Sequence, residues 1–272
     1  MLFRSDGWKG RAGDAMLKLL TKRLRERGGK LTLNTRGRRL IFEGARCVGV
    51  VAETGGRESE YRAKYVVLAD GGFQADPELV RRFISPHPER VQQRNARTAR
   101  GDAIRMLEAA GVRLVGMKYF YGHLLSRDAM TCDGLWPYPG LDSLATAGIV
   151  VNGAGARFLD EGLGGVYITN AVAWSEDPLD SWVVFDEEIW NGPGRAELFQ
   201  IASNPGLVQA KGTIFKADTI GALEKAAGFP ASYHQPCTSL TPTLCPSLMS
   251  CCIASVISSS PLDEGKILSM AS

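Results

Sequence analysis

The first regular pattern along the chain is a helical repeat of apolar residues near the amino terminus. Apolar side chains recur there at the three- and four-residue intervals of one helix face: Met16, Leu17, Leu20 and Leu24. Asp14 precedes the repeat and can cap its first turn, and Gly28 and Gly29 follow its last residue. We therefore predict a helix over residues 15–27 that has one apolar face.

Beyond this helix the pattern changes to short apolar stretches that are separated by turn residues. The first stretch, residues 30–34, predicts a strand. Further stretches follow at the spacing of hairpins, with glycines in the turns between them, and they cover residues 39–42, 47–52 and 58–63. These stretches predict a three-stranded meander.

An uninterrupted apolar run, residues 66–69, follows the meander and is itself followed by Asp70, Gly71 and Gly72. Such a run predicts a strand that is buried on both faces, as in a parallel sheet. Adjacent glycines let a ligand approach the main chain closely, and ligands of open α/β sheets bind at the carboxyl ends of strands. Taken alone, the pattern favours the simpler interpretation of an ordinary turn between a strand and a loop.

The rest of the chain alternates between helical, extended and irregular segments. The pattern predicts helices over 77–83, 101–110 and 220–227, a strand over 182–186, and a loop over 84–100. Residues 116–147 are aromatic and irregular, which suits a lining that faces a substrate, although a loosely packed linker is the alternative. Residues 233–272 are rich in Ser, Thr, Pro and Cys without either period, which predicts a disordered tail.

The composition is that of a globular protein with one large domain or two smaller ones. Of the 272 residues, 44% are hydrophobic and 22% are charged, and the net charge of +3 is too small to indicate a nucleic-acid partner. Lys and Arg exceed the acids between residues 4 and 46, where a nucleic-acid patch is conceivable. A solvated helix face explains the excess better, because no aromatic residues interleave with the charges.

No run of apolar residues is long enough for a membrane span, and the first residues lack the pattern of a secretory signal. We therefore expect a cytoplasmic protein without a membrane partner. The 6 cysteines form no C-x-x-C pair, and the 3 histidines do not lie at metal-ligand spacing from them, so no metal site is expected.

Several segments, in this order along the chain, resemble one family of flavoproteins. The most specific is residues 148–161, which combine a glycine, an aliphatic run, Val-Asn and then Gly-x-Arg-Phe-x-x-Glu. The others are residues 34–40, 47–50, 63–73 and 101–103. Together they resemble the fumarate reductase/succinate dehydrogenase flavoprotein family, which includes soluble fumarate reductases, 3-ketosteroid dehydrogenases and tricarballylate dehydrogenases. The resemblance runs from about Gly10 to Ser232.

The resemblance implies an α/β fold class, with a two-lobed, Rossmann-like FAD-binding domain that contains a β-meander, and an α+β capping domain. By this comparison, residues 1–111 form a partial FAD-binding domain, 112–232 the capping or substrate domain, and 233–272 a tail outside the family. The cofactor implied is FAD. The family's G-x-G-x-x-G turn for the diphosphate has no counterpart in this sequence, so we expect a chain truncated at both ends.

The resemblance also implies which residues contact the cofactor. The candidates are Gly37, Ala69, Gly71, Gly72 and Asp102. Gly37 could equally be a plain turn glycine, and Asp102 could be an acid that a helix amino terminus stabilises. Asp70 departs from the small or hydroxyl residue usual in the family, and its charge would be unfavourable near a diphosphate unless it points away.

Other residues match positions near the substrate. His123 lies at the spacing of a family histidine that holds a substrate carboxylate, although a lone histidine is more often structural. Tyr167 is a candidate for proton transfer, as are other tyrosines of residues 119–121. Arg157 and Glu161 would brace the substrate cleft or form a structural ion pair. No Arg or Lys follows Glu161 before residue 171, which disfavours the arginine-based mechanism of fumarate reductases.

Two functional interpretations follow. The first is an FAD-dependent oxidoreductase, a dehydrogenase or reductase, that acts on a C–C bond adjacent to a carbonyl or carboxylate of a small-molecule substrate. Its chemistry would be hydride transfer between the substrate carbon and the flavin, with a protein acid or base handling the proton. The alternative is an inactive fragment or pseudoenzyme that binds no flavin, which the missing diphosphate turn favours.

Overall fold

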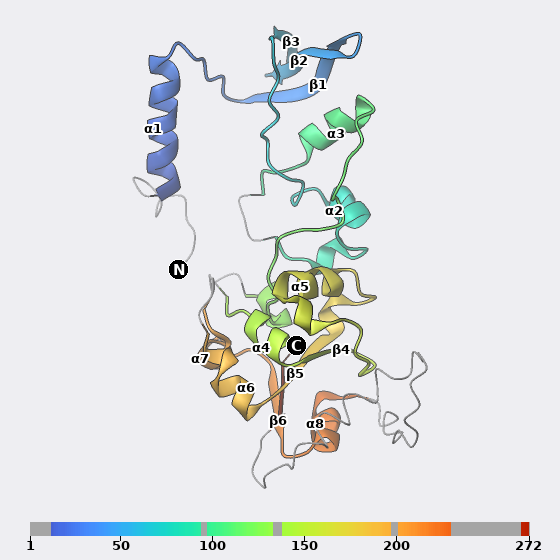
Figure 1. The fold of residues 1–272 in the computed structure, drawn as a ribbon. Coiled ribbons are helices and arrows are strands. Elements are labelled where there is room, and N and C mark those ends of the chain that lie inside the picture. The colour runs from blue at the N-terminus through green and yellow to red at the C-terminus, as the bar shows by residue number, and fades with distance from the viewer. Residues whose placement is uncertain (1–11, 94–96, 133–137, 197–200, 230–267, 272) are drawn as a thin grey trace. The chain divides into compact units, whose positions relative to one another are not determined.

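A computed structural model of the chain describes residues 12–93, 97–132, 138–196, 201–229 and 268–271. It divides into two compact units (Figure 1). The N-terminal unit comprises Met1–Phe83 and Gln93–Met117, and the C-terminal unit comprises Ile84–Gln92 and Lys118–Ser272. No helix within the described ranges is both long and apolar enough to cross a membrane.

The N-terminal unit begins with helix α1 (Ala12–Glu26) and continues into an antiparallel sheet of β1 (Thr35–Glu43), β2 (Arg46–Thr54) and β3 (Arg57–Arg62). The predicted helix and the predicted meander are thus confirmed, although β1 starts earlier than the pattern suggested. The apolar face of α1 is exposed to solvent; Leu17, for example, is 61% exposed.

Two predicted strands of this unit are wrong. Residues 30–34 are irregular, and residues 66–69 form no strand. Val67 is 85% exposed, which is the opposite of a buried strand. A strand is stable only where a neighbour accepts its backbone hydrogen bonds, and no described strand pairs with either segment.

Helices α2 (Pro77–Phe83) and α3 (Asp102–Ala109) complete the N-terminal unit and confirm the predicted helices there. α3 packs against β1, and Met106 is its buried contact residue. Leu79 and Val80 of α2 are also buried. The buried side chains of this unit therefore lie between the meander and α3 and on α2.

The C-terminal unit contains an antiparallel four-stranded sheet in the order β4-β5-β7-β6. Its strands are β4 (Ile149–Asn152), β5 (Ser181–Asp186), β6 (Ile214–Ala217) and β7 (Leu268–Ala271). β5 confirms the strand predicted over 182–186. β7 lies within the tail expected to be disordered, so that expectation is wrong for these residues, while 230–267 and 272 fall outside the described ranges.

Helices surround this sheet and bury its larger apolar side chains. They are α4 (Asp142–Ala147), α5 (Gly165–Ala173), α6 (Glu187–Asn191), α7 (Ser203–Gln209) and α8 (Ile220–Ala227). Short 3-10 helices lie at Pro88–Arg90, Arg127–Met130, Glu161–Leu163, Pro178–Asp180 and Pro193–Arg195. Leu144 of α4 and Ile168 of α5 are fully buried in the main core cluster.

The aromatic segment 116–147 is more regular than predicted. It contains α4, a 3-10 turn, and an isolated bridge between Leu125 and Gly140. Tyr119 is 78% exposed and Tyr121 is 71% exposed. Trp136 of the same segment lies outside the described residues. Helix α8 confirms the prediction over 220–227.

Candidate functional site

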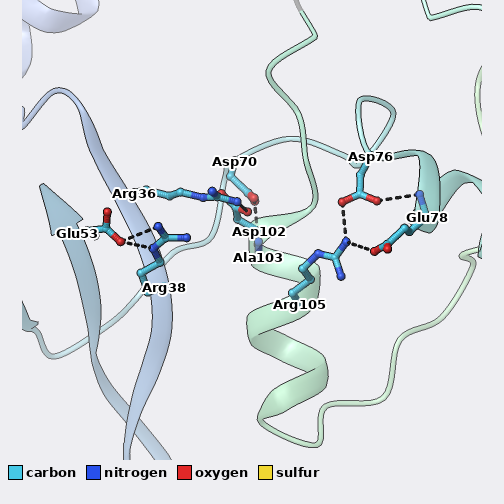
Figure 2. Close-up of polar contacts among 9 residues, drawn as sticks. All are labelled: Arg36, Arg38, Glu53, Asp70, Asp76, Glu78, Asp102, Ala103 and Arg105. Carbon is cyan, nitrogen blue, oxygen red and sulfur yellow. Dashed lines mark hydrogen bonds and ion pairs between the residues drawn. The ribbon is translucent and has the colours of Figure 1, made fainter. Parts of the chain in front are cut away.

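An ion pair joins β1 to the first turn of α3 in the N-terminal unit (Figure 2). Arg36 of β1 donates two hydrogen bonds to Asp102, from Nε at 2.8 Å and from Nη2 at 2.6 Å. The Arg36 hydrogen bonds hold the pKa of the Asp102 carboxyl below its ordinary value, although partial burial opposes the shift. Asp102, a predicted cofactor-binding residue, is therefore engaged as the ion-pair partner of Arg36.

Asp70 caps helix α3 from outside the helix. The residue that precedes α3 is Gly101, whose φ of 73° is left-handed and which has no capping side chain. A Cβ at Gly101 would overlap Leu79 Cδ1 and lie 2.9 Å from Phe73 Cβ, so only glycine fits there. The Asp70 Oδ2 accepts the Ala103 N–H at 2.9 Å in place of a local cap.

This contact resolves the electrostatic difficulty that Asp70 posed in the sequence. Its carboxylate lies at the positive end of the α3 dipole, where an anion is stabilised. Figure 2 shows the Asp70 carboxylate directed at Ala103. The Asp70 side chain is thus held by its hydrogen bond to the Ala103 N–H.

Helix α3 is also tied to α2 and to the residue before it. Arg105 donates to Asp76 Oδ2 at 2.6 Å and to Glu78 at 3.3 Å (Figure 2). Asp76 in turn accepts the Glu78 and Leu79 N–H groups at 3.0 Å. Burial alone would raise the pKa of Asp76, but the Leu79 and Arg105 hydrogen bonds hold it below its ordinary value. These contacts fix the orientation of α3.

All five predicted cofactor-binding residues lie in the N-terminal unit. Gly37 faces α3, because a Cβ built there would lie 3.4 Å from Met106 Cε. Gly71 is exposed with a φ of 88°, which only glycine adopts readily. In the described part of the chain, the N–H groups of residues 66–71 donate no hydrogen bond. This segment therefore presents open main chain to a ligand or to another segment of protein.

His123 lies in the C-terminal unit beside a carboxylate that the sequence analysis missed. Its Nδ1 is 3.3 Å from Asp142 Oδ2, and the ring of Tyr121 stands edge-on at 5.0 Å between centroids. Burial raises the pKa of the Asp142 carboxyl, against the opposing effect of His123. The sequence offered only weak evidence for a functional Asp142, because an acid is common at the first residue of a helix.

The segment before His123 is docked on helix α5, which also carries Tyr167. Asn170 of α5 accepts the Phe120 N–H at 3.0 Å and donates to the Phe120 carbonyl at 2.8 Å. Tyr167 is 41% exposed. The structure therefore brings His123 and the helix of Tyr167 into one region of the C-terminal unit.

Arg157 and Glu161 form an ion pair at the edge of the second sheet. Glu161 is 3% exposed, and its Oε1 accepts the Val150 N–H of edge strand β4 at 2.7 Å. Arg157 donates to the same carboxylate from Nε at 2.9 Å and from Nη2 at 2.5 Å. The pair thus satisfies a backbone donor that β4, as an edge strand, cannot pair within the sheet.

Comparisons with known proteins identify the family of the chain. The family model described as "FAD binding domain" matches residues 4–239. Urocanate reductase of Eggerthella lenta is 25% identical over 236 residues, which cover 84% of this chain and 37% of that protein. The 4-oxocyclohexanecarboxylate 2-dehydrogenase of Sinomonas cyclohexanicum is 31% identical over 161 residues, 56% of this chain and 27% of that protein.

A solved structure with a similar fold is the 3-ketosteroid Δ4-(5α)-dehydrogenase of Rhodococcus jostii RHA1. It matches 82% of this chain and 42% of its own chain, with 23% identity and a TM-score of 0.53. This likeness confirms the predicted α/β fold class as part of the FAD-binding oxidoreductase fold. The chain spans less than half the length of each of these relatives.

The matches define the class of protein: a member of a flavin-binding family. The chain belongs to the FAD binding domain family, and its resemblance to the fumarate reductase flavoproteins is confirmed. The family match indicates FAD as the cofactor. The open main chain of residues 66–71, which includes Gly71 with its φ of 88°, fits one wall of an FAD site. The sequence still holds no G-x-G-x-x-G turn for the diphosphate.

Proposed function

We propose that this chain is part of an FAD-dependent oxidoreductase that acts on a C–C bond next to a carbonyl or carboxylate of a small molecule. The observation that carries the proposal is the family match over residues 4–239. The relatives are named as a reductase and two dehydrogenases, and two of the names specify an oxo or keto group on the compound. FAD, when bound, supplies the hydride acceptor or donor for such chemistry.

In this proposal the N-terminal unit is the FAD-binding part. Gly71 and Gly72 let the cofactor approach the main chain, and residues 66–71 offer it N–H groups that no acceptor within the described ranges engages. Gly37 and Ala69 complete the small-residue wall. Asp102 acts through Arg36, because their bidentate pair fixes where the guanidinium of β1 lies.

The C-terminal unit is the capping part and carries the substrate residues. His123 contacts the carbonyl or carboxylate oxygen of the substrate, for which an imidazole is a suitable donor. Tyr167 on α5 is the candidate for proton transfer, and its phenol is partly exposed as such a role requires. Arg157 and Glu161 brace the sheet edge next to this region.

The experiment is flavin retention followed by a substrate screen. The full chain is incubated with FAD, freed of excess by gel filtration, and examined by visible absorption. The proposal predicts a retained flavin band that 3-ketosteroids or unsaturated carboxylic acids change under anaerobic conditions. A chain that retains no flavin would support the alternative of an inactive fragment.

A pair of glycine variants tests the location of the cofactor. Gly71→Ala and Gly116→Ala carry the same backbone strain, since φ is 88° at Gly71 and 72° at Gly116. That strain is about 1–2 kcal/mol at each position. We expect Gly71→Ala to lower FAD retention severalfold and Gly116→Ala to leave it unchanged. Equal losses in both variants would place the flavin elsewhere.

A further inference from the structure

The carboxylate of Asp142 is held in a fixed position against the His123 imidazole. Asp142 is the first residue of α4, its Oδ2 is 3.3 Å from His123 Nδ1, and its Oδ1 accepts the Leu124 N–H at 3.5 Å. The two interactions clamp the ring and the backbone that follows it to the same carboxylate.

Helix α5 leaves room for this carboxylate at its first residue. A Cβ at Gly165 would lie 2.7 Å from Asp142 Oδ1, so any larger residue there would displace the acid. The side chains of Asp142 and His123 are 20% and 25% exposed. Each therefore keeps most of its surface against the protein while a minor part of the imidazole reaches solvent.

An ionised carboxylate can only accept hydrogen bonds, so the ring nitrogen that faces it must carry the hydrogen. In the neutral imidazole that leaves Nε2 as the nitrogen with the lone pair. When the ring is protonated, Nε2 becomes a second donor, directed away from Asp142. Nε2 is thus the ring nitrogen at which His123 can accept or donate a proton while Nδ1 keeps its hydrogen.

Burial works against an acid at this position. Burial raises the pKa of Asp142, which means that the ionised form is disfavoured by its surroundings. A neutral amide of the same shape would avoid that cost. Unlike an amide, a carboxylate presents only acceptor atoms to the ring and therefore fixes the hydrogen on Nδ1.

We propose that Asp142 is a positioning residue that holds His123 as the Nδ1–H tautomer, so that Nε2 is the atom that exchanges a hydrogen bond or a proton with the substrate. The substrate half of this inference rests on the proposed function. The tautomer half concerns the protein alone.

The test is the tautomer of His123, read from ring nitrogen chemical shifts in long-range proton–nitrogen correlation spectra of histidine-labelled full chain. The chain has 3 histidines, and His123→Gln identifies the signals of His123. We expect Nδ1–H in the unmodified protein. In Asp142→Asn the single amide oxygen accepts the Leu124 N–H and its NH₂ group faces Nδ1, so Nε2–H becomes the major tautomer.

Asp218→Asn is the matched control, because it removes an exposed carboxylate of the same unit. We expect it to leave the His123 tautomer unchanged, and Asp142→Glu to restore part of the Nδ1–H form. Finding Nε2–H in the unmodified protein would overturn the proposal without any variant, and so would an unchanged tautomer in a folded Asp142→Asn protein.

Kinetics separate this inference from the proposed function. With a substrate from the screen, Asp142→Asn should lower kcat by about 10- to 100-fold, as for other groups that orient a functional histidine, with KM changed far less. Turnover that Asp142→Asn leaves intact would overturn the positioning role. Absence of turnover in the unmodified protein would overturn the proposed function, while the tautomer still decides the role of Asp142.

Discussion

The ion pair of Arg157 and Glu161 makes a quantitative prediction about the stability of the C-terminal unit. Glu161→Ala removes a carboxylate that is 3% exposed and leaves the Val150 N–H of edge strand β4 without its acceptor. The lost hydrogen bond to a charged group contributes about 1.5–3 kcal/mol, and an unsatisfied buried donor costs about 1–3 kcal/mol. These two figures overlap, because they describe the same N–H.

Arg157 adds little to the cost, because its side chain is 31% exposed and can turn to water once Glu161 is gone. We therefore expect Glu161→Ala to lower the free energy of unfolding by about 3 kcal/mol. Glu161→Gln retains an oxygen for the Val150 N–H and loses only the charge pair. We expect it to cost about 1.5 kcal/mol, the lower end of the range for a lost hydrogen bond to a charged group.

The assay is urea unfolding followed by tryptophan fluorescence. Trp182 and Trp190, which are 5% and 6% exposed, report on the C-terminal unit. With a denaturant slope of about 2 kcal/mol per M, Glu161→Ala should shift the midpoint by about 1.5 M.

Lys216→Ala serves as the control, because its pair with Glu187 is 3.9 Å long and half exposed, and should change stability by less than about 0.5 kcal/mol. A shift for Glu161→Ala no larger than that of Lys216→Ala would refute the assignment of Glu161 as the brace of β4.

Two further predictions concern the N-terminal unit. Gly101→Ala should destabilise it by about 2–4 kcal/mol, because the new side chain adds left-handed backbone strain and overlaps Leu79. Gly111→Ala, at the same φ of 73° but in open space, should cost only about 1–2 kcal/mol. Thermal unfolding followed by circular dichroism measures both variants, and equal costs would contradict the overlap. Because Arg36 lowers the pKa of Asp102, the stability that this carboxylate adds is present above its unfolded pKa of about 3.9 and is lost as pH falls through the folded value. Asp102→Asn should therefore be less stable than the unmodified protein at neutral pH and equally stable at low pH, and a gap that persists in acid unfolding would contradict the pair.

The elements that the sequence predicted correctly are those whose causes are local. The meander follows from short stretches at hairpin spacing with glycines in the turns between them. Helix α8 is capped by the Thr219 hydroxyl, which accepts the Ala222 N–H at 3.2 Å. The strand expected over 66–69 failed because a strand depends on a partner elsewhere in the chain, and no described strand supplies one.

The same distinction holds for the candidate site. Arg157 and Glu161 are four residues apart, so their spacing in the signature segment indicated the pair directly. The partners of Asp102 and His123 were missed, because Arg36 lies 66 residues from Asp102 and Asp142 lies far along the chain from His123. Contacts of this kind depend on the folded arrangement of separate elements, which no local pattern contains.

Titration of FAD with the full chain, followed by quenching of flavin fluorescence, tests the central claim most directly. The account predicts saturable quenching at one flavin per chain, weakened by Gly71→Ala and unaffected by Gly116→Ala. Fluorescence that stays unchanged at every protein concentration would show that the residues present here do not hold the cofactor, and would contradict the assignment of this chain as an FAD-binding oxidoreductase.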